Sequence, residues 1–430
     1  MIRKICVFLT VLAVLLHTSG VALAATETVL YLDADGKSQT AAAKVLEGGV
    51  KILDEEWYIA RGTWAFDETI TVHGDVNLIL EDGCRMTVTG FEADLDAGIN
   101  VTEGNSFTIY AQSTGPEMGK LDATGAILGA GIGGGMYGNG GIITICGGSV
   151  TATGGDKGAG IGGGIYGNGG IITICGGSVM AAGGDKGTGI GAGSGDDFDP
   201  VGNGGTVKIT GGIVKATGGG NAQAIGKGEG IGDPGTTEIT GGSVEADQSK
   251  VDNPTNANGA ALKRCDQDYA GYAGKAVSFS VPVAPEYIYS FTVPEGGTAY
   301  LWLPDGVSSD YLDLVKAKLI IENEIYEAAR GDARNITKAK AAVEAFIGAL
   351  KLPDGVTFTV NDITFTAAKA LTDGAYTFNV TLEKGTASLE TSAIDMLITA
   401  AASGDGGCLN AGTGTLGILA LLACLRRRRK

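Results

Sequence analysis

The stretch GNGGIITICGGSV occurs twice in the chain without a change, at Gly138–Val150 and again at Gly167–Val179. Its apolar residues alternate with polar ones, so that Ile143 and Ile145 face one way and Thr144 the other, which is typical of a β-strand. Glycine pairs flank the strand and fit tight turns, because glycine tolerates positive φ. The duplication could mark two copies of an active site or a structural repeat. A stack of identical layers requires identical segments, so we interpret it as a structural repeat.

The same strand recurs beyond these two copies at intervals close to 30 residues. Matching pairs lie at Leu78/Leu80, Phe107/Ile109, Ile143/Ile145, Ile172/Ile174, Val207/Ile209 and Thr237/Ile239, in steps of 29, 36, 29, 35 and 30 residues. A period near 30 with Gly-Gly turns indicates a solenoid. We therefore predict a mainly β fold over residues 25–248, a right-handed parallel β-helix of about six coils with an N-terminal cap.

Composition and charge exclude several classes of protein. Glycine supplies 74 of the 430 residues without a Gly-X-Y period, and 44% of the residues are hydrophobic, which excludes collagen and a disordered glycine-rich linker. Residues 1–24 and 409–430 together hold seven Lys or Arg residues and no Asp or Glu, so the region between them has a net charge of −24. Such a surface repels nucleic acids and anionic lipids. We expect no nucleic-acid partner.

The pattern changes after residue 248. Residues 249–275 are predicted to form a linker or a C-terminal cap, and residues 276–402 a small α+β spacer module. Alternating residues predict three strands in 276–304, with Trp302 as the anchor of a small sheet. Farther on, helical spacing predicts an amphipathic helix with an apolar face made by Ala339, Val343, Phe346, Ile347 and Leu350.

Residues 1–24 have the features of a secretory signal peptide. Arg3 and Lys4 precede an apolar run, Ile5–Leu16, and Ala22-Leu23-Ala24 forms a small-x-small cleavage site. The predicted partner is signal peptidase. The alternative is a membrane anchor that is retained.

The other end, residues 403–430, has the features of a sorting signal. Leu409–Leu425 contains 17 uncharged residues, enough for a short transmembrane helix, and the cations of Arg426–Lys430 follow it. With Gly406-Gly407-Cys408 before the helix, the segment resembles the Synerg-CTERM sorting signal. The resemblance implies cleavage near Cys408 by a rhombosortase-like protease, and the alternative is a permanent membrane anchor. Both place the body of the protein in the cell envelope or on the cell surface.

The body of the chain, over about Trp57–Ala246, resembles bacterial surface proteins described as carbohydrate-binding domain proteins, which have a pectin-lyase-like β-helix. The matching motifs are the GAGIGGG…GNGG coils and the strands before them. The resemblance implies a glycan or an envelope polysaccharide as partner. The motifs consist of structural glycines and core aliphatic residues, so the resemblance transfers no sugar-binding residue to this chain.

Two cysteines stack in the predicted coils. Cys146 and Cys175 occupy the same position of adjacent coils, so their Cα atoms should lie about 4.8 Å apart, within the range of a disulfide. They form either a disulfide or two stacked thiols. Cys84 and Cys265 have no matching positions, and the sequence leaves their pairing open.

Two tyrosines also stack, in GGMYGNGG and GGIYGNGG. Tyr137 and Tyr166 are the candidate glycan-binding residues, because an aromatic ring with a polar hydroxyl suits a sugar ring. The alternative is that the two rings only shield a corner of the solenoid.

Acidic residues offer a candidate cation site. Asp196, Asp197 and Asp199 lie in one loop without a neighbouring base, and Ca²⁺ is the ion that such carboxylates suit. The alternative is a solvated loop. The corner residues Asp156 and Asp185 each have an adjacent lysine, which favours a solvated corner over a metal site or a hydrolytic acid pair. We predict no other cofactor.

The sequence predicts no catalytic residue. Outside the signal peptide, His73 is the only histidine, so any Ser-His-Asp or Cys-His scheme would depend on it. We expect a non-catalytic surface protein that binds carbohydrate or mediates adhesion. The alternatives are a secreted polysaccharide lyase or hydrolase of the β-helix type and a purely structural envelope protein.

Overall fold

The computed structural model describes residues 26–91, 95–195, 202–230, 232–329, 336–361, 363–366 and 375–399. The predicted signal peptide and the predicted sorting segment lie outside these ranges. The chain divides into two compact units, Met1–Leu312 and Asp313–Lys430, and each is described by itself. Among the described residues, no helix combines the length and the apolar character needed to cross a bilayer.

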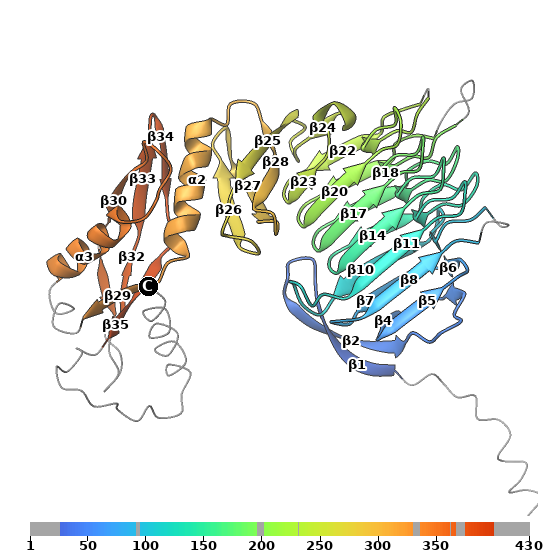
Figure 1. The fold of residues 1–430 in the computed structure, drawn as a ribbon, viewed down its shortest axis with the longest axis horizontal. Coiled ribbons are helices and arrows are strands. Elements are labelled where there is room, and N and C mark those ends of the chain that lie inside the picture. The colour runs from blue at the N-terminus through green and yellow to red at the C-terminus, as the bar shows by residue number, and fades with distance from the viewer. Residues whose placement is uncertain are drawn as a thin grey trace, which may run out of the picture. The chain divides into compact units, whose positions relative to one another are not determined.

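Three stacked sheets, A, B and C, make up most of the first unit (Figure 1). From β4 onward, a strand of sheet A is followed by one of sheet C and one of sheet B, and we call one such passage a coil. Neighbouring strands in these sheets pair in parallel, except that β1 and β2 are antiparallel. The unit is thus mainly β with parallel-stacked sheets, an arrangement compatible with a β-helix.

Each sheet takes one strand from each coil. Sheet A runs β1 (Thr26–Leu32), β2 (Ser38–Val45), β4 (Trp57–Ala60), β7 (Asp75–Leu80), β10 (Ser106–Ala111), β13 (Ile142–Ile145), β16 (Ile171–Ile174), β19 (Thr206–Ile209), β22 (Thr236–Ile239) and β24 (Pro254–Thr255). Sheet C runs β5 (Thr63–Phe66), β8 (Arg85–Thr89), β11 (Lys120–Thr124), β14 (Ser149–Thr153), β17 (Ser178–Ala182), β20 (Ile213–Thr217) and β23 (Ser243–Glu245). Sheet B runs β3 (Ile52–Leu53), β6 (Ile70–Val72), β9 (Ile99–Asn100), β12 (Ile132–Gly133), β15 (Ile161–Gly162), β18 (Ile190–Gly191) and β21 (Ile225–Gly226).

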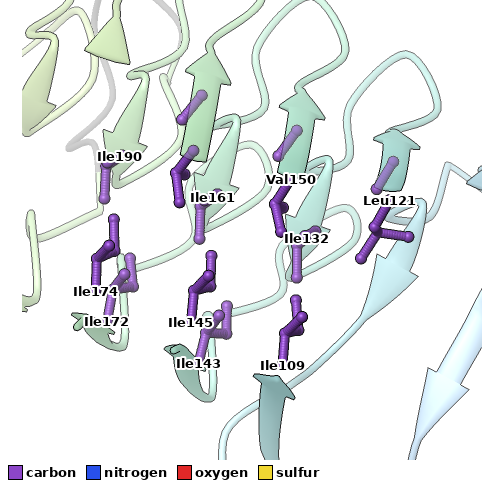
Figure 2. Close-up of a cluster of buried hydrophobic side chains, with 14 of the residues drawn as sticks. Ile109, Leu121, Ile132, Ile143, Ile145, Val150, Ile161, Ile172, Ile174 and Ile190 are labelled. Carbon is purple, nitrogen blue, oxygen red and sulfur yellow. The ribbon is translucent and has the colours of Figure 1, made fainter. Parts of the chain in front are cut away.

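Every second side chain of a strand points into the stack. In one coil, Ile143 and Ile145 of β13, Val150 of β14 and Ile161 of β15 are at most 1% exposed, and they converge on the interior (Figure 2). The next coil repeats this set one layer farther along. Since full burial of such an aliphatic side chain stabilises a protein by about 1.5–3 kcal/mol, the stacked aliphatics are the main source of stability.

The strand register follows the predicted repeat in the central coils and departs from it at one step. Between β10, β13, β16, β19 and β22 the paired residues are those that the repeat predicts. Between β7 and β10 the prediction was wrong by two residues, because Phe107 pairs with Val76 and Ile109 with Leu78. A two-residue shift keeps the same side chains inward, so alternation alone cannot fix this register.

Sheet B contains a column of glycines where the coils approach one another closely. Gly133, Gly162 and Gly191 have φ between +135° and +138°. A Cβ on Gly162 would lie 1.9 Å from the carbonyl oxygen of Gly191 in the next coil. This spacing requires glycine at these positions and fixes where the turns after sheet B begin.

A column of asparagines lies in the turns from sheet B to sheet A. The backbone N–H of Asn168 donates to Oδ1 of Asn139 at 2.9 Å, and that of Asn203 donates to Oδ1 of Asn168 at 2.7 Å. Each side chain therefore satisfies a backbone donor of the following coil. These bonds hold successive turns in the same conformation.

The N-terminal hairpin β1–β2 covers the outer side of the first coils. Tyr31 of β1 packs on Trp57 and Tyr110, with ring centroids 4.9 and 4.7 Å apart. At the end of the stack, Trp64 lies over Gly48, where an added Cβ would be 2.5 Å from the indole ring. Aromatic rings thus cover both the outer face and the open end of the first coils.

Two antiparallel strand pairs close the C-terminal end of the stack. They are β25 (Leu262–Asp268) with β28 (Thr298–Pro304) and β26 (Ala276–Val281) with β27 (Ala284–Thr292), preceded by the 3-10 helix η2 (Gln248–Lys250). Trp302 is fully buried in the core of the coils, and its Nε1–H donates to the Val244 carbonyl at 2.9 Å. The predicted spacer begins at residue 276, whereas β26, β27 and β28 belong to the compact unit that contains the coils.

The second unit is an α+β arrangement with its own core. Helix α2 (Ser309–Glu322) begins in the first unit and is followed by β29 (Tyr326–Ala329), α3 (Ile336–Gly348), β30 (Thr357–Val360), β31 (Thr364–Thr366), β32 (Ala375–Phe378), β33 (Val380–Lys384), β34 (Ala387–Glu390) and β35 (Ile394–Thr399). Ala339, Val343 and Ile347 of α3 are buried as the helical spacing predicts. Phe346 remains 39% exposed, with its ring 5.0 Å from that of Tyr326.

Candidate functional site

Tyr137 and Tyr166 lie one above the other in the turns that follow β12 and β15. Their ring centroids are 5.5 Å apart and their planes differ by 12°. Tyr137 is 64% exposed, the highest value among the large hydrophobic side chains in the described ranges, and Tyr166 is partly buried beside it. The structure therefore brings the two predicted glycan-binding residues together as one aromatic stack at the surface.

Both tyrosines have a left-handed backbone conformation, with φ of +59° at Tyr137 and +61° at Tyr166. For a residue with a side chain this conformation costs roughly 1–2 kcal/mol. The surrounding backbone holds it, because the Tyr137 N–H donates to the Ile165 carbonyl at 3.1 Å and the Tyr166 N–H to the Ser194 carbonyl at 2.9 Å. Such outliers concentrate at functional sites, and here the same outlier occurs in two successive coils.

A second set of turns, between sheets C and B, supports the tyrosine turns. The Ile165 N–H donates to the Leu128 carbonyl at 2.9 Å, and the Ser194 N–H donates to the Lys157 carbonyl at 2.8 Å. In each case the acceptor lies in the turn from sheet C to sheet B of one coil. The donor lies in the turn that follows sheet B in the next coil. Backbone hydrogen bonds consequently hold the turns that carry the two tyrosines in this conformation.

The stack suits recognition better than bond-breaking chemistry. A tyrosine ring offers an apolar face, and its hydroxyl both donates and accepts a hydrogen bond. A sugar ring has matching parts, with axial C–H groups on its faces and hydroxyls at its rim. Two parallel rings held 5.5 Å apart present such a contact in two successive coils.

Cys146 and Cys175 form a disulfide on the outer face of sheet A. Their Cα atoms are 4.8 Å apart, the distance that the coil spacing predicts. The bond joins adjacent coils across 29 residues of sequence. The turns that carry Tyr137 and Tyr166 lead directly into β13 and β16, the two strands that the disulfide follows and links.

Removing this disulfide is expected to lower the free energy of unfolding of the first unit by about 3 kcal/mol, because the unfolded chain regains the freedom of the closed loop. Urea unfolding followed by tryptophan fluorescence measures the effect, since all three tryptophans, Trp57, Trp64 and Trp302, lie in that unit. A reducing agent should destabilise the parent chain and leave the Cys146→Ala/Cys175→Ala variant unaffected. Equal sensitivity of the two proteins to the reducing agent would contradict the assignment.

The other cysteines in the described ranges are poor nucleophiles. Cys84 is buried, and burial raises the pKa of its thiol to about 11, so the thiol stays protonated at neutral pH. Burial also raises the pKa of Cys265.

The structure leaves the candidate cation site untested. Asp196, Asp197 and Asp199 lie outside the described residues. Asp156 and Asp185 are exposed at their corners. Within the described ranges, no group of three or more His, Cys, Asp or Glu side chains is arranged to hold a metal ion.

The remaining predicted residues lie apart from the stack or outside the described ranges. His73 is 55% exposed and lies 3.6 Å from Asp54, Nδ1 to Oδ1, near the N-terminal end of the coils. Gly406, Gly407 and Cys408 lie in the segment that the structure does not describe. Their roles in sorting stay predictions.

Two features of the site were not predicted from the sequence. The asparagine column could have been found, because GNGG places Asn139, Asn168 and Asn203 at one position of successive repeats. The aromatic cluster of Tyr31, Trp57 and Tyr110 could not have been found from the repeat, because Tyr31 lies outside the repeated segments.

Comparison with known proteins adds no constraint. A scan against protein-family models, a search of curated proteins and a search of solved structures each gave no match to the chain.

Proposed function

We propose that the chain is a non-catalytic cell-surface protein, in which a right-handed parallel β-helix binds carbohydrate or mediates adhesion. The observation that carries the proposal is the exposed stack of Tyr137 and Tyr166, held in a costly backbone conformation in two successive coils. A stack that only covered a corner of the solenoid would not require exposed rings. A stack that binds sugar rings must expose them.

The outward positions of the central coils support a non-catalytic role. Thr144 and Thr173 on sheet A and Thr151 and Met180 on sheet C carry no group that exchanges a proton near neutral pH. Lyases and hydrolases that act on polysaccharides need carboxylates or bases clustered against the substrate. A fold of this type does not by itself imply such an enzyme.

The ends of the chain and the disulfide support a position outside the cytoplasm. The first 24 residues have the order of parts of a signal peptide, and the last residues resemble a sorting signal. The Cys146–Cys175 disulfide fits an oxidising environment. We propose export by signal peptidase processing and attachment or anchoring through the C-terminal segment.

The double substitution Tyr137→Gly/Tyr166→Gly is expected to weaken binding at least tenfold for the glycans that the parent chain binds in a glycan-array screen, with and without Ca²⁺. Glycine adopts positive φ without strain, so the free energy of unfolding should stay within about 1 kcal/mol of the parent value. The matched control, Tyr137→Phe/Tyr166→Phe, keeps both rings and should retain most of the binding.

Three results would count against the proposal. Glycan binding that the loss of both rings leaves unchanged would place the site elsewhere on the chain. A large loss of stability in the glycine variant would mean that the rings serve as structural cover. Release of products from polysaccharides incubated with the chain would support the lyase or hydrolase alternative.

A further inference from the structure

We propose that the outer face of sheet A over β10, β13 and β16 is a second binding surface, for a neutral polysaccharide chain. This surface, the outer A face, includes Ile142, Thr144, Ile171, Thr173, Tyr110 and the Cys146–Cys175 disulfide. The proposal shares its ligand class with the proposed function but uses a surface on another sheet. The two can therefore fail separately.

The outer A face exposes aliphatic side chains that the core does not need. Ile142 is 46% exposed and Ile171 is 48% exposed, whereas Ile143 and Ile172 beside them are fully buried. The strands pair Ile142 with Ile171, so the two exposed side chains are neighbours. An outward position in a strand is usually polar, and an aliphatic pair there is more typical of a contact surface.

The face is regular and held rigid. Thr144 pairs with Thr173, which places two hydroxyls in register beside the isoleucine pair. On the other side of the threonines, the disulfide holds the same two strands with Cα atoms 4.8 Å apart. The two coils that begin with β13 and β16 therefore present the same outward sequence, isoleucine, threonine and half-cystine, one strand spacing apart.

Aromatic rings extend the face at its N-terminal end. The Cys146 N–H donates to the Ile109 carbonyl, which places the disulfide beside Tyr110. The ring of Tyr110 stacks on Trp57, with centroids 5.3 Å apart and planes at 18°, and Tyr31 packs against both. All three rings are half-buried, so each keeps some surface for a ligand.

Charge determines which partner this face suits. The chain has a net charge of −17, yet the outward residues of β10, β13 and β16 are uncharged. The next strand, β19, brings Lys208, paired with Glu238 at 3.1 Å, and ends the uncharged region. A cationic partner would bind more favourably to the acidic parts of the chain. An uncharged partner gives up no electrostatic attraction by binding to this uncharged face.

Size and regularity favour a polysaccharide over a second copy of the chain. Three strands of four to six residues span about 240 Å², from strand spacings of ~4.8 Å and rises of ~3.3 Å. Two such faces would bury roughly 500 Å², below the ~1,200 Å² of a stable protein interface. A face that repeats at a fixed step instead complements a ligand that is itself a repeating chain.

The test compares two lysine substitutions at equally exposed positions. Ile171→Lys introduces a charge into the outer A face, and Met180→Lys does so on sheet C, where Met180 is 51% exposed. The probes are retention of the full chain on microcrystalline cellulose and on insoluble starch, with polygalacturonate as the charged comparison. Ile171→Lys should weaken retention about tenfold, because bound ligand would cover an unpaired charge, while Met180→Lys should change it less than about twofold.

Each outcome decides the proposal. The proposal is supported if Ile171→Lys and a second variant, Ile142→Lys, both lose retention on the neutral polysaccharides while their unfolding midpoints stay at the parent value. Equal retention of the Ile171 and Met180 variants, or no retention of the parent on either neutral polymer, overturns it. Loss only with Tyr137→Gly/Tyr166→Gly would overturn it and support the tyrosine site alone. A dimer in sedimentation that Ile171→Lys dissociates would also overturn it, in favour of a second copy.

Discussion

Replacing Gly162 with alanine is expected to lower the free energy of unfolding of the first unit by about 3–4 kcal/mol. Two effects add at this position. The φ of +135° strongly disfavours a residue with a side chain. The new methyl group would also lie 1.9 Å from the Gly191 carbonyl oxygen, so the two coils must move apart. Urea unfolding followed by tryptophan fluorescence measures the loss.

Gly115→Ala separates the two effects. Gly115 has φ of +125°, close to that of Gly162, and nothing lies within 4 Å of the position that its Cβ would take. This control should cost about 1–2 kcal/mol from backbone strain alone. If the two alanine variants are equally stable, the close approach of the coils at Gly162 is not the source of the expected loss.

Replacing Trp302 with alanine is expected to cost about 3–5 kcal/mol, the range for truncating a fully buried large side chain. Trp302 closes the core at the C-terminal end of the stack, and its Nε1–H satisfies the buried Val244 carbonyl. The variant should therefore expose the last coil as well as leave a cavity. Hydrogen exchange of β22 and β23 measures the exposure, beside the urea midpoint.

The control for this prediction is Trp302→Phe, which fills most of the space but cannot make the hydrogen bond. It should cost about 1–2 kcal/mol, mainly from the carbonyl left without a partner. Protection of β22 and β23 that remains at the parent level in the alanine variant would show that Trp302 does not close the stack.

The sequence predicts the coils well because their positions repeat. The alternation around Ile143 and Ile145 indicates strands, and the 29-residue interval indicates which strands lie side by side. The same interval places Tyr137 above Tyr166 and Cys146 above Cys175 in the structure. Repetition thus turns spacing in sequence into contact in space.

Features that do not repeat were beyond this reasoning. The register of β7 against β10 depends on turn length, and a two-residue shift leaves the inward pattern unchanged. Trp302 was predicted to anchor a small sheet, yet its indole lies in the core of the coils and bonds to Val244, 58 residues away. The left-handed backbone at Tyr137 also has no signal in residue type, because tyrosine does not favour it.

The verbatim repeat of the opening stretch has a consequence for the dimensions of the protein. Each coil meets its neighbours through nearly the same side chains, so packing does not dictate how many coils the stack contains. Gain or loss of one 29-residue copy would lengthen or shorten the stack by a step of about 4.8 Å and leave the ends unchanged. The number of repeat copies therefore sets the distance between the N-terminal hairpin and the strand pairs that close the C-terminal end of the stack.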